Sequence, residues 1–489
     1  MRKILELAEK EFATGIAPDA NTQNKGLFHK AAGITVIGGA YSESTTVGPL
    51  QAGPAPVDIS NGVIADAPFA WVTDVTGSSN EFLYLWGNAG NLYKLNLLGD
   101  NFPTNVSSGA TVSNPANGLL IMQAAGGTKY VLYFQEDQIG RWDPTGAWSG
   151  RTNNWKTGLQ STSWHPTHKF QDRGYYGNGH YIGFVYDNGA GDLDTDKTAL
   201  DFEPTERVNC LSDDGVYLVV GVTKNTSTDI SAHGKCRIIF WDTNQSSWQR
   251  EWSIPDASIV AIRRTASGMQ ALTSRGIWSF SFDTPPTPLF PYLVGTLAPN
   301  QALPSQFIAD TWGGAMIYAS GQTVSAVGKI VPQLPSSFST PFAGIANSPD
   351  GPTLVAANVQ TNVIYVGTSN SKLFRIRPSE TPSTGVSAET IFIELLRWYQ
   401  IGKIVVNFDR QLASGDNVSI QATQDRNTSF TTFGSATFAS QGAIRSKEMY
   451  KSLEAHKLKL VINFIAGAVK IRSIEVWGDP IATPNHTRA

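Results

Sequence analysis

Residues 82–95 read FLYLWGNAGNLYKL, and this stretch decides the fold class because it joins two apolar, aromatic-rich runs through a turn. The first run is Phe82–Trp86 and the second is Leu92–Leu95, and both have the length and composition of β-strands. The intervening residues 87–90 contain glycine and asparagine, which supply the positive φ angles that tight hairpin turns require. The stretch therefore predicts a β-hairpin.

The second run of this hairpin recurs along the chain as a four-residue strand core with apolar ends. Its copies are Ile139–Trp142, Ile238–Trp241, Ile277–Phe280 and Leu373–Ile376, with weaker ones at Tyr181–Phe184 and Val324–Val327. Successive copies lie about 40–57 residues apart, close to the ~40–50 residues of a four-stranded propeller blade. The repeat predicts an all-β protein whose body is a β-propeller of about seven blades. Six blades, an irregular first blade, or a string of meanders in a large sandwich are the alternatives.

The pattern changes after a segment rich in Pro, Ser and Thr, which is typical of a linker. Longer alternating strands follow it, and in residues 404–408 and 458–464 the apolar side chains largely dominate one face, as in a β-sandwich. Residues 449–457 fit either a helical turn or a further strand. The predicted domains are an N-terminal helix and extended arm at 1–46, the propeller at 47–378, the linker at 379–387, the C-terminal sandwich at 388–480 and a tail at 481–489.

The first ten residues predict a short amphipathic helix. Ile4, Leu7 and Ala8 fall at helical spacing, and Glu6 and Lys10 lie one turn apart. The charged residues interrupt the apolar run, so the segment does not have the pattern of a signal peptide. The chain also contains no apolar stretch long enough for a membrane span.

Charge is sparse in this chain, at 16% Asp, Glu, Lys and Arg against the ~25% of typical soluble domains. Sparse charge is expected where neighbouring subunits cover the surface, and equally in a monomer with a neutral surface of Ser, Thr and Asn. The net charge of −3 lacks the basic footprint of a protein that grips nucleic acid, although it permits DNA to pass. Cys210 and Cys236, the only cysteines, are expected to be buried free thiols.

Two parts of the sequence resemble the nozzle and hub proteins of bacteriophage tails. The C-terminal part resembles the β-sandwich of phage tail proteins through residues 411–420, 458–462 and 469–476. Residues 26–35, GLFHKAAGIT, resemble the segment that precedes the propeller in tail nozzle proteins. The resemblance implies a structural virion protein, assembled in the host cytoplasm, that forms a homo-oligomeric ring below the portal. Such a ring retains or passes DNA without reading its sequence, and its other neighbours are adaptor and fibre proteins.

An acidic segment offers the clearest candidate for metal binding. Its oxygen-bearing residues occupy positions 1, 3, 5, 7 and 12 of a loop, the arrangement that surrounds Ca²⁺. Lys197 stands where the sharp turn of such a loop favours glycine, and a solvated acidic loop is the alternative. Residues 187–206 and 223–234 are both expected to be long polar loops. The candidate calcium ligands are Asp192, Asp194, Asp196, Thr198 and Glu203.

No catalytic motif stands out in the sequence, so the chain is not expected to be an enzyme. A propeller glycosidase would need two carboxylates that face one pocket. The adjacent pairs Arg263-Arg264 and Asp213-Asp214 do not predict a shared site, because neighbours on a strand point to opposite faces. The functional alternative to the tail nozzle is a calcium-dependent propeller module of a phage tail that binds glycans or a receptor.

Overall fold

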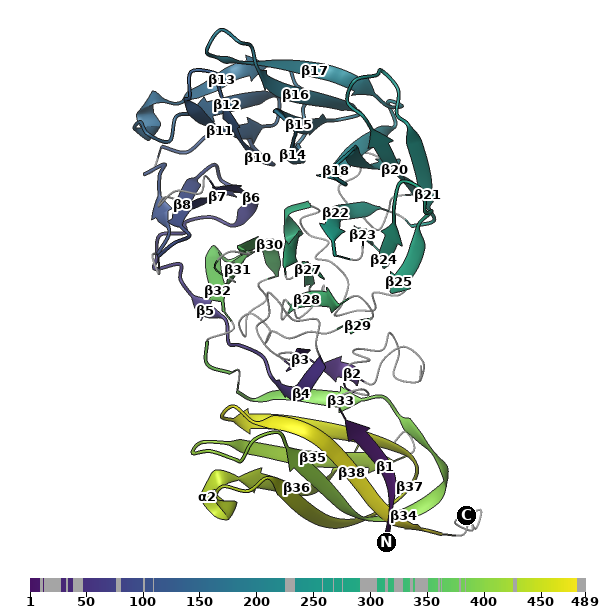
Figure 1. Ribbon diagram of the computed structural model, residues 1–489. Coiled ribbons are helices and arrows are strands. Elements are labelled where there is room, and N and C mark those ends of the chain that lie inside the picture. Colours follow the sequence, from purple (N-terminus) through teal and green to yellow (C-terminus); the bar gives the residue numbers. More distant parts are fainter. Residues whose placement is uncertain are drawn as a thin grey trace. The chain divides into compact units, whose positions relative to one another are not determined.

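The structure is a computed structural model in which the chain divides into two compact units. One unit contains residues 57–328 and 345–375, and the other contains residues 1–56, 329–344 and 376–489 (Figure 1). The structure describes residues 1–8, 12, 28–31, 34–37, 47–75, 81–99, 102–108, 110–224, 234–256, 258–266, 268–274, 276–290, 306–312, 315–320, 329–334, 337–338, 351–358, 361, 363–377, 380–382, 384–424 and 429–481.

The first unit is a β-propeller built from four-stranded antiparallel sheets. The hydrogen bonds of the described residues define seven such sheets, of which six lie wholly in this unit. The seventh sheet has the strand order β26 (Ala309–Trp312), β27 (Ala315–Ser320), β28 (Lys329–Leu334), β29 (Ser337–Phe338). Its strands β26 and β27 belong to this unit. The predicted propeller class is therefore confirmed.

Five of the six complete sheets are consecutive in the chain, each taking four successive strands. The first three of these sheets contain β6 (Pro68–Asp74), β7 (Phe82–Gly87), β8 (Leu92–Asn96) and β9 (Thr104–Asn105); β10 (Pro115–Gln123), β11 (Lys129–Gln135), β12 (Gln138–Trp142) and β13 (Thr152–Thr157); and β14 (Thr167–Phe170), β15 (Arg173–Asn178), β16 (Tyr181–Asp187) and β17 (Leu193–Asp201). The next two contain β18 (Glu206–Asp213), β19 (Leu218–Lys224), β20 (Gly234–Trp241) and β21 (Arg250–Ile254); and β22 (Ile259–Thr265), β23 (Gly268–Thr273), β24 (Ile277–Phe280) and β25 (Thr287–Phe290).

The recurring four-residue motif is the third strand of a sheet. Six of its seven copies fall on third strands, namely β8, β12, β16, β20, β24 and β32 (Lys372–Ile376), and Val324–Val327 lies outside the described residues. The middle strands are apolar because both of their faces are covered by neighbouring sheets. All but the last residue of β19 is buried, for example, whereas most of the outer strand β21 is partly exposed.

The last sheet is closed by a strand from the beginning of the propeller. Its first three strands are β30 (Pro352–Asn358), β31 (Val363–Thr368) and β32, and its fourth is β5 (Val57–Asp58). Phe374 pairs with Asp58 and Arg375 with Val57. The Lys372 ammonium lies 3.0 Å from the Asp58 carboxylate. The strand through which the chain enters the propeller thus pairs with the strand through which it leaves.

The second unit is the predicted β-sandwich, and it includes strands from both ends of the chain. The C-terminal strands are β33 (Val386–Thr390), β34 (Ile393–Phe408), β35 (Asn417–Gln424), β36 (Thr431–Thr437), β37 (Ser446–Ala466) and β38 (Lys470–Pro480), with the short helix α2 (Phe438–Gln441). Residues 449–457 belong to β37, so the strand alternative was right. The N-terminal half of β37 pairs with β34, and its C-terminal half pairs with β33 and β35. The long strand β37 therefore connects β34 on one side with β33 and β35 on the other.

The N-terminal residues join this sandwich, which corrects the predicted helix and arm. β1 (Arg2–Ala8) pairs antiparallel with β38, β2 (Phe28–Ala31) pairs with β33, and β4 (Val47–Ala52) pairs with β38 and with β3 (Ile34–Ile37). The helix prediction was wrong because a segment this short gains little from helix propensity alone. Pairing with β38 and burial of Leu7 outweigh that propensity.

Among the described residues, no helix has both the length and the apolar character needed to cross a membrane.

Candidate functional site

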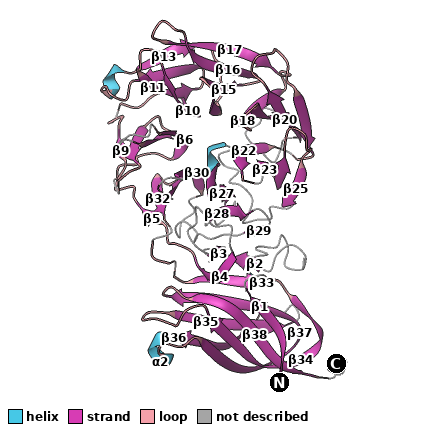
Figure 2. Cartoon of the chain, in the orientation of Figure 1, coloured by secondary structure: helices cyan, strands magenta, loops and turns pink. Residues whose placement is uncertain are grey.

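A short helix, η3 (Gln306–Ile308), lies at the centre of the propeller, among the first strands of its sheets (Figure 2). All three of its side chains are buried. The Gln306 amide holds two sheets together: its Oε1 accepts a hydrogen bond from the Leu211 backbone at 2.9 Å, and its Nε2 donates to the Thr167 carbonyl at 2.6 Å. The indole of Trp71 donates to the Phe307 carbonyl at 3.3 Å. Residues from β6, β14 and β18 thus fasten η3 across the axis.

Arg263 on β22 fixes the same segment from another side. Its guanidinium donates to three backbone carbonyls, those of Ile262 at 2.8 Å, Gln306 at 2.6 Å and Ala309 at 2.7 Å. Burial lowers the pKa of Arg263 from its usual value. Arg264, the next residue, is exposed. The two arginines therefore point to opposite faces, as the strand geometry predicts.

Asp310 follows η3 and carries a perturbed carboxyl group. One oxygen accepts from the Thr311 backbone and the other from the Ala357 backbone, both at 2.7 Å. Burial raises the pKa of Asp310 to about 6, and the positive charge of Arg263 and these hydrogen bonds limit the rise. The group is thus partly protonated near pH 6.

The Asp310 carboxyl predicts a pH dependence of stability. Its pKa is higher in the folded protein than the ordinary value of 3.8, so the folded state binds the proton more tightly. The stability that this proton contributes is complete below pH 4 and is lost as the pH rises through about 6. Asp310→Asn should therefore become progressively more stable relative to the unsubstituted protein between pH 4 and pH 7, as measured by urea unfolding. A constant difference across this range would contradict the assignment.

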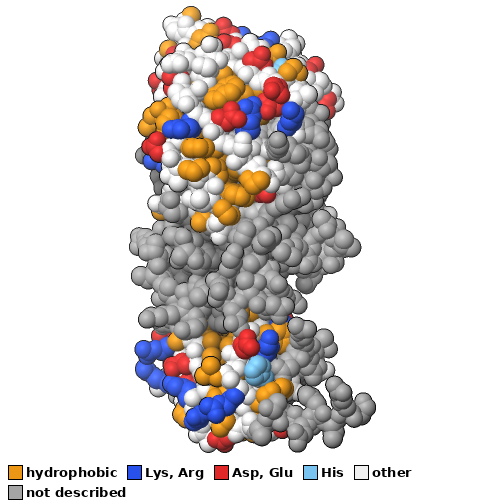
Figure 3. Space-filling view, turned by 90° about the vertical axis from the view of Figure 1, so that its right-hand side faces the viewer, with side chains coloured by type: hydrophobic (Ala, Val, Ile, Leu, Met, Phe, Trp, Pro, Cys, Tyr) orange, Lys and Arg blue, Asp and Glu red, His pale blue; other side chains and the backbone are white. Residues whose placement is uncertain are grey.

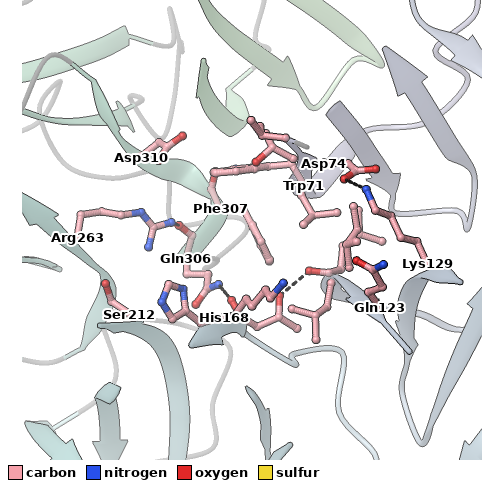
Figure 4. A pocket seen from close by; sticks show the side chains of 18 residues that line it. Trp71, Asp74, Gln123, Lys129, His168, Ser212, Arg263, Gln306, Phe307 and Asp310 are labelled. Atoms are coloured by element: carbon pink, nitrogen blue, oxygen red, sulfur yellow. Dashed lines mark hydrogen bonds and ion pairs between the residues drawn. The ribbon is translucent and has the colours of Figure 1, made fainter. Parts of the chain in front are cut away.

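A cavity of about 490 Å³ lies beside η3, where β6, β10 and β14 come together (Figure 4). Its volume is in the range of small-molecule sites. Trp71 and Phe307 form part of its apolar wall and meet edge to face, with 6.2 Å between ring centroids. Its charged lining residues are Asp74, Lys129, Lys169, Arg263 and Asp310, with His168 as a titratable neighbour.

One ion pair and one hydrogen bond between an imidazole and a carboxylate hold polar side chains at the wall of this cavity. The Lys129 ammonium lies 2.8 Å from the Asp74 carboxylate, and the imidazole Nε2 of His168 lies 2.7 Å from the Asp213 carboxylate. Burial alone would raise the pKa of Asp213, but the hydrogen bond from His168 and the nearby positive charge lower it. Asp213 is therefore an anion that orients the His168 ring. Ser212 also lines the cavity. His168 hydrogen-bonds to the carboxylate of Asp213, the residue that follows Ser212 in the chain.

Three of the five predicted calcium ligands, Asp194, Asp196 and Thr198, lie on a strand, which corrects the expected loop at 187–206; Asp192 precedes this strand and Glu203 follows it. β17 spans Leu193–Asp201, and its acidic side chains meet cations of the preceding sheet. Asp192 pairs with Arg141, and the Asp194 carboxylate lies 2.6 Å from the Lys156 ammonium. This hydrogen bond from Lys156 lowers the pKa of Asp194. A β-strand forms here because β16 offers a pairing edge, a long-range contact that the acidic pattern does not reveal.

The remaining predicted ligands are held separately. The Asp196 carboxylate accepts from the Thr198 backbone at 2.9 Å, and the Glu203 carboxylate lies 3.6 Å from the Lys224 ammonium. Within the described part of the chain, no three His, Cys, Asp or Glu side chains are grouped as metal ligands. Calcium binding stays a prediction. Two of the carboxylates that it would use, those of Asp192 and Asp194, contact the side chains of Arg141 and Lys156. Of the second expected loop, residues 225–233 lie outside the described residues.

Cys210 and Cys236 are buried free thiols, as the sequence predicts. Burial raises the pKa of Cys210 to about 12, and burial likewise raises that of Cys236. Both groups are therefore protonated at neutral pH, and a thiolate nucleophile is not available at either position.

The sequence did not single out η3 or the cavity. Gln306 hydrogen-bonds Thr167 across 139 residues and Leu211 across 95, and no local motif encodes such contacts. The one available signal was Arg263-Arg264, an adjacent basic pair on a predicted strand, of which one member has to face inward.

Comparisons with known proteins identify no family for this chain. No family model matches it, and no curated protein matches it. Among solved structures, the WD40 domain of Neurospora crassa Pan2 is similar with a TM-score of 0.42 and 9% identity, over 68% of this chain and 97% of that one. The N-terminal part of BBS1 in a complex with ARL6 is similar with a TM-score of 0.41 and 11% identity, over 65% of this chain and 94% of that one.

Proposed function

We propose that the protein is a structural component of a bacteriophage tail, which assembles with further copies of itself into a ring. Its role would be to build a channel below the portal and to retain or pass DNA, without covalent chemistry. Its neighbours would be the portal, adaptor and fibre proteins, and its site of action the virion. The resemblance of residues 411–420, 458–462 and 469–476 to phage tail proteins is the sequence support for this role.

The observation that carries the proposal is an apolar side chain held outside the sandwich by a large bulge. In β34, Glu394 pairs with Lys457 and Tyr399 pairs with Ala455, so residues 395–398 stand opposite a single residue of β37. Leu396 in this bulge is 97% exposed. Burial of this leucine by a neighbouring copy would remove apolar surface from water, which is the contribution that it makes to the proposed ring.

Apolar and charged side chains are interspersed on the propeller as well. On the face drawn in Figure 3, hydrophobic side chains form separate patches between basic and acidic ones. On the sandwich, Tyr450 is 60% exposed. Together with the low content of charged residues, these features support a surface that is covered on assembly.

The position of η3 bears on where DNA would run in the proposed ring. Because η3 is fastened by hydrogen bonds among the inner strands, we do not place the DNA path through the centre of one propeller. A DNA path would therefore be enclosed by several copies together, and the function requires an oligomer. The net charge of −3 suits a path along which DNA moves without being gripped.

The mass of the protein in solution tests this proposal. We expect light scattering to show a closed oligomer, alone or once a portal ring is added, and Leu396→Asp to reduce its population by at least about tenfold. Leu98→Asp is the matched control, because Leu98 is an exposed leucine in a turn of the propeller. A monomer under both conditions would refute the ring.

The same measurement with Ca²⁺ addresses the calcium-dependent module that binds glycans or a receptor. A monomer whose melting temperature rises with Ca²⁺, and whose rise is abolished by Asp194→Asn, would favour that alternative over the ring. If the melting temperature is the same with and without Ca²⁺, the calcium-dependent module is refuted.

A further inference from the structure

The cavity beside η3 has the composition of a site for a small hydroxylated molecule. Its wall combines the partly exposed indole of Trp71 with the ring of Phe307, and aromatic faces pack against the C–H faces of sugar rings. Gln123, Ser212 and Asp74 add donors and acceptors for hydroxyl groups. The volume of about 490 Å³ accommodates one or two sugar rings.

The charges of the wall favour an anion. Among the lining residues, Lys129, Lys169 and Arg263 contribute three positive charges and Asp74 and Asp310 at most two negative ones; the Asp213 carboxylate contacts His168 and is not itself a lining residue. The Lys129 charge is compensated by Asp74 at 2.8 Å. Lys169 lines the cavity and is exposed, so its charge is accessible to a ligand from solvent.

The hydrogen bonds around the cavity keep this wall in place before any ligand arrives. Trp71 is held by the Phe307 carbonyl, and His168 is held by Asp213. Preorganised side chains lose little conformational entropy on binding, which favours even a small ligand.

We propose that this cavity binds the terminal uronic acid residue of a glycan. Trp71 packs against the sugar ring, the hydroxyl groups bond to Gln123 and Asp74, and the carboxylate faces Lys169. This inference is independent of ring assembly, since every residue that it uses lies in one propeller.

Calorimetric titration of the full chain with methyl β-D-glucuronide tests the site. A ligand of this size is expected to bind with a dissociation constant of about 1 mM. Methyl β-D-glucoside, in which a neutral hydroxymethyl group replaces the carboxylate, and acetate, which lacks the sugar, should each bind at least about tenfold more weakly. The affinity for the glucuronide should fall with added salt.

Charge reversal at Lys169 supplies the matched variant. Lys169→Glu should weaken glucuronide binding by at least about tenfold, because an attraction to the carboxylate becomes a repulsion; the position is exposed, so the change in folding stability is expected to be small. Lys451→Glu, an identical change at an exposed position of the sandwich, should leave the affinity unchanged. The proposal is overturned if the glucuronide does not bind, if the glucoside or acetate binds as tightly, or if Lys169→Glu binds like the unsubstituted protein. None of these results bears on the ring, which light scattering tests separately.

Discussion

Replacing Trp86 with alanine is expected to lower the free energy of unfolding of the propeller by about 3–5 kcal/mol. Trp86 on β7 is completely buried, and its ring lies 5.2 Å from that of Tyr133 on the neighbouring sheet. Its indole nitrogen donates to the Ala116 carbonyl at 3.1 Å. The substitution leaves a cavity between two sheets and also leaves that buried carbonyl without its donor, so the two losses add.

Urea unfolding followed by circular dichroism measures this loss. Trp155→Ala makes the same chemical change on the outer strand β13, where the side chain is only partly buried, and should cost clearly less. Equal losses for the two variants would show that Trp86 does not form the contact between the sheets. The effect should be confined to the propeller transition if the sandwich unfolds as a separate unit.

Replacing Arg263 with methionine is expected to cost about 3 kcal/mol or more of unfolding free energy. Methionine fills much of the arginine volume but cannot donate hydrogen bonds. The carbonyls of Gln306 and Ala309 then lose the donors that hold η3 on the axis. The loss of the nearby positive charge would also raise the pKa of Asp310 further.

Arg264→Met is the control for this experiment, because Arg264 is the exposed neighbour on the same strand. It should change the unfolding free energy by less than about 0.5 kcal/mol. A second measurement is hydrogen exchange at the Leu211 amide, which donates to Gln306. Exchange at this amide should be faster in Arg263→Met than in the unsubstituted protein, and unchanged in Arg264→Met. An unchanged rate in Arg263→Met would mean that η3 stays in place without the guanidinium.

The propeller was predictable because its repeat is local. Copies such as Leu92–Leu95 and Ile238–Trp241 are third strands, and a strand covered on both faces has to be apolar wherever it occurs. The change in pattern beyond residue 385 likewise indicated the sandwich, because alternation follows directly from one buried face.

What could not be predicted depends on contacts between distant residues. Residues 2–8 have a helical pattern, and only the distant strand β38 makes them a strand. The acidic run beginning at Asp192 has the pattern of a calcium loop. Its contacts are made with distant residues: Asp192 binds Arg141, 51 residues away, and Asp194 binds Lys156, 38 residues away. The cavity is formed by inner strands and η3 together, so no window of sequence contains it.

The pairing of β5 with β32, and of β1 and β4 with β38, has a consequence for synthesis on the ribosome. The partners of the first strands to leave the ribosome are among the last to be made. β5 and β1, and the edge of β4 that later pairs with β38, must therefore wait without these partners while the intervening sheets form, and neither unit can close before translation of its final strands. A polypeptide interrupted before residue 372 would expose open strand edges in both units, which are substrates for chaperones and for aggregation.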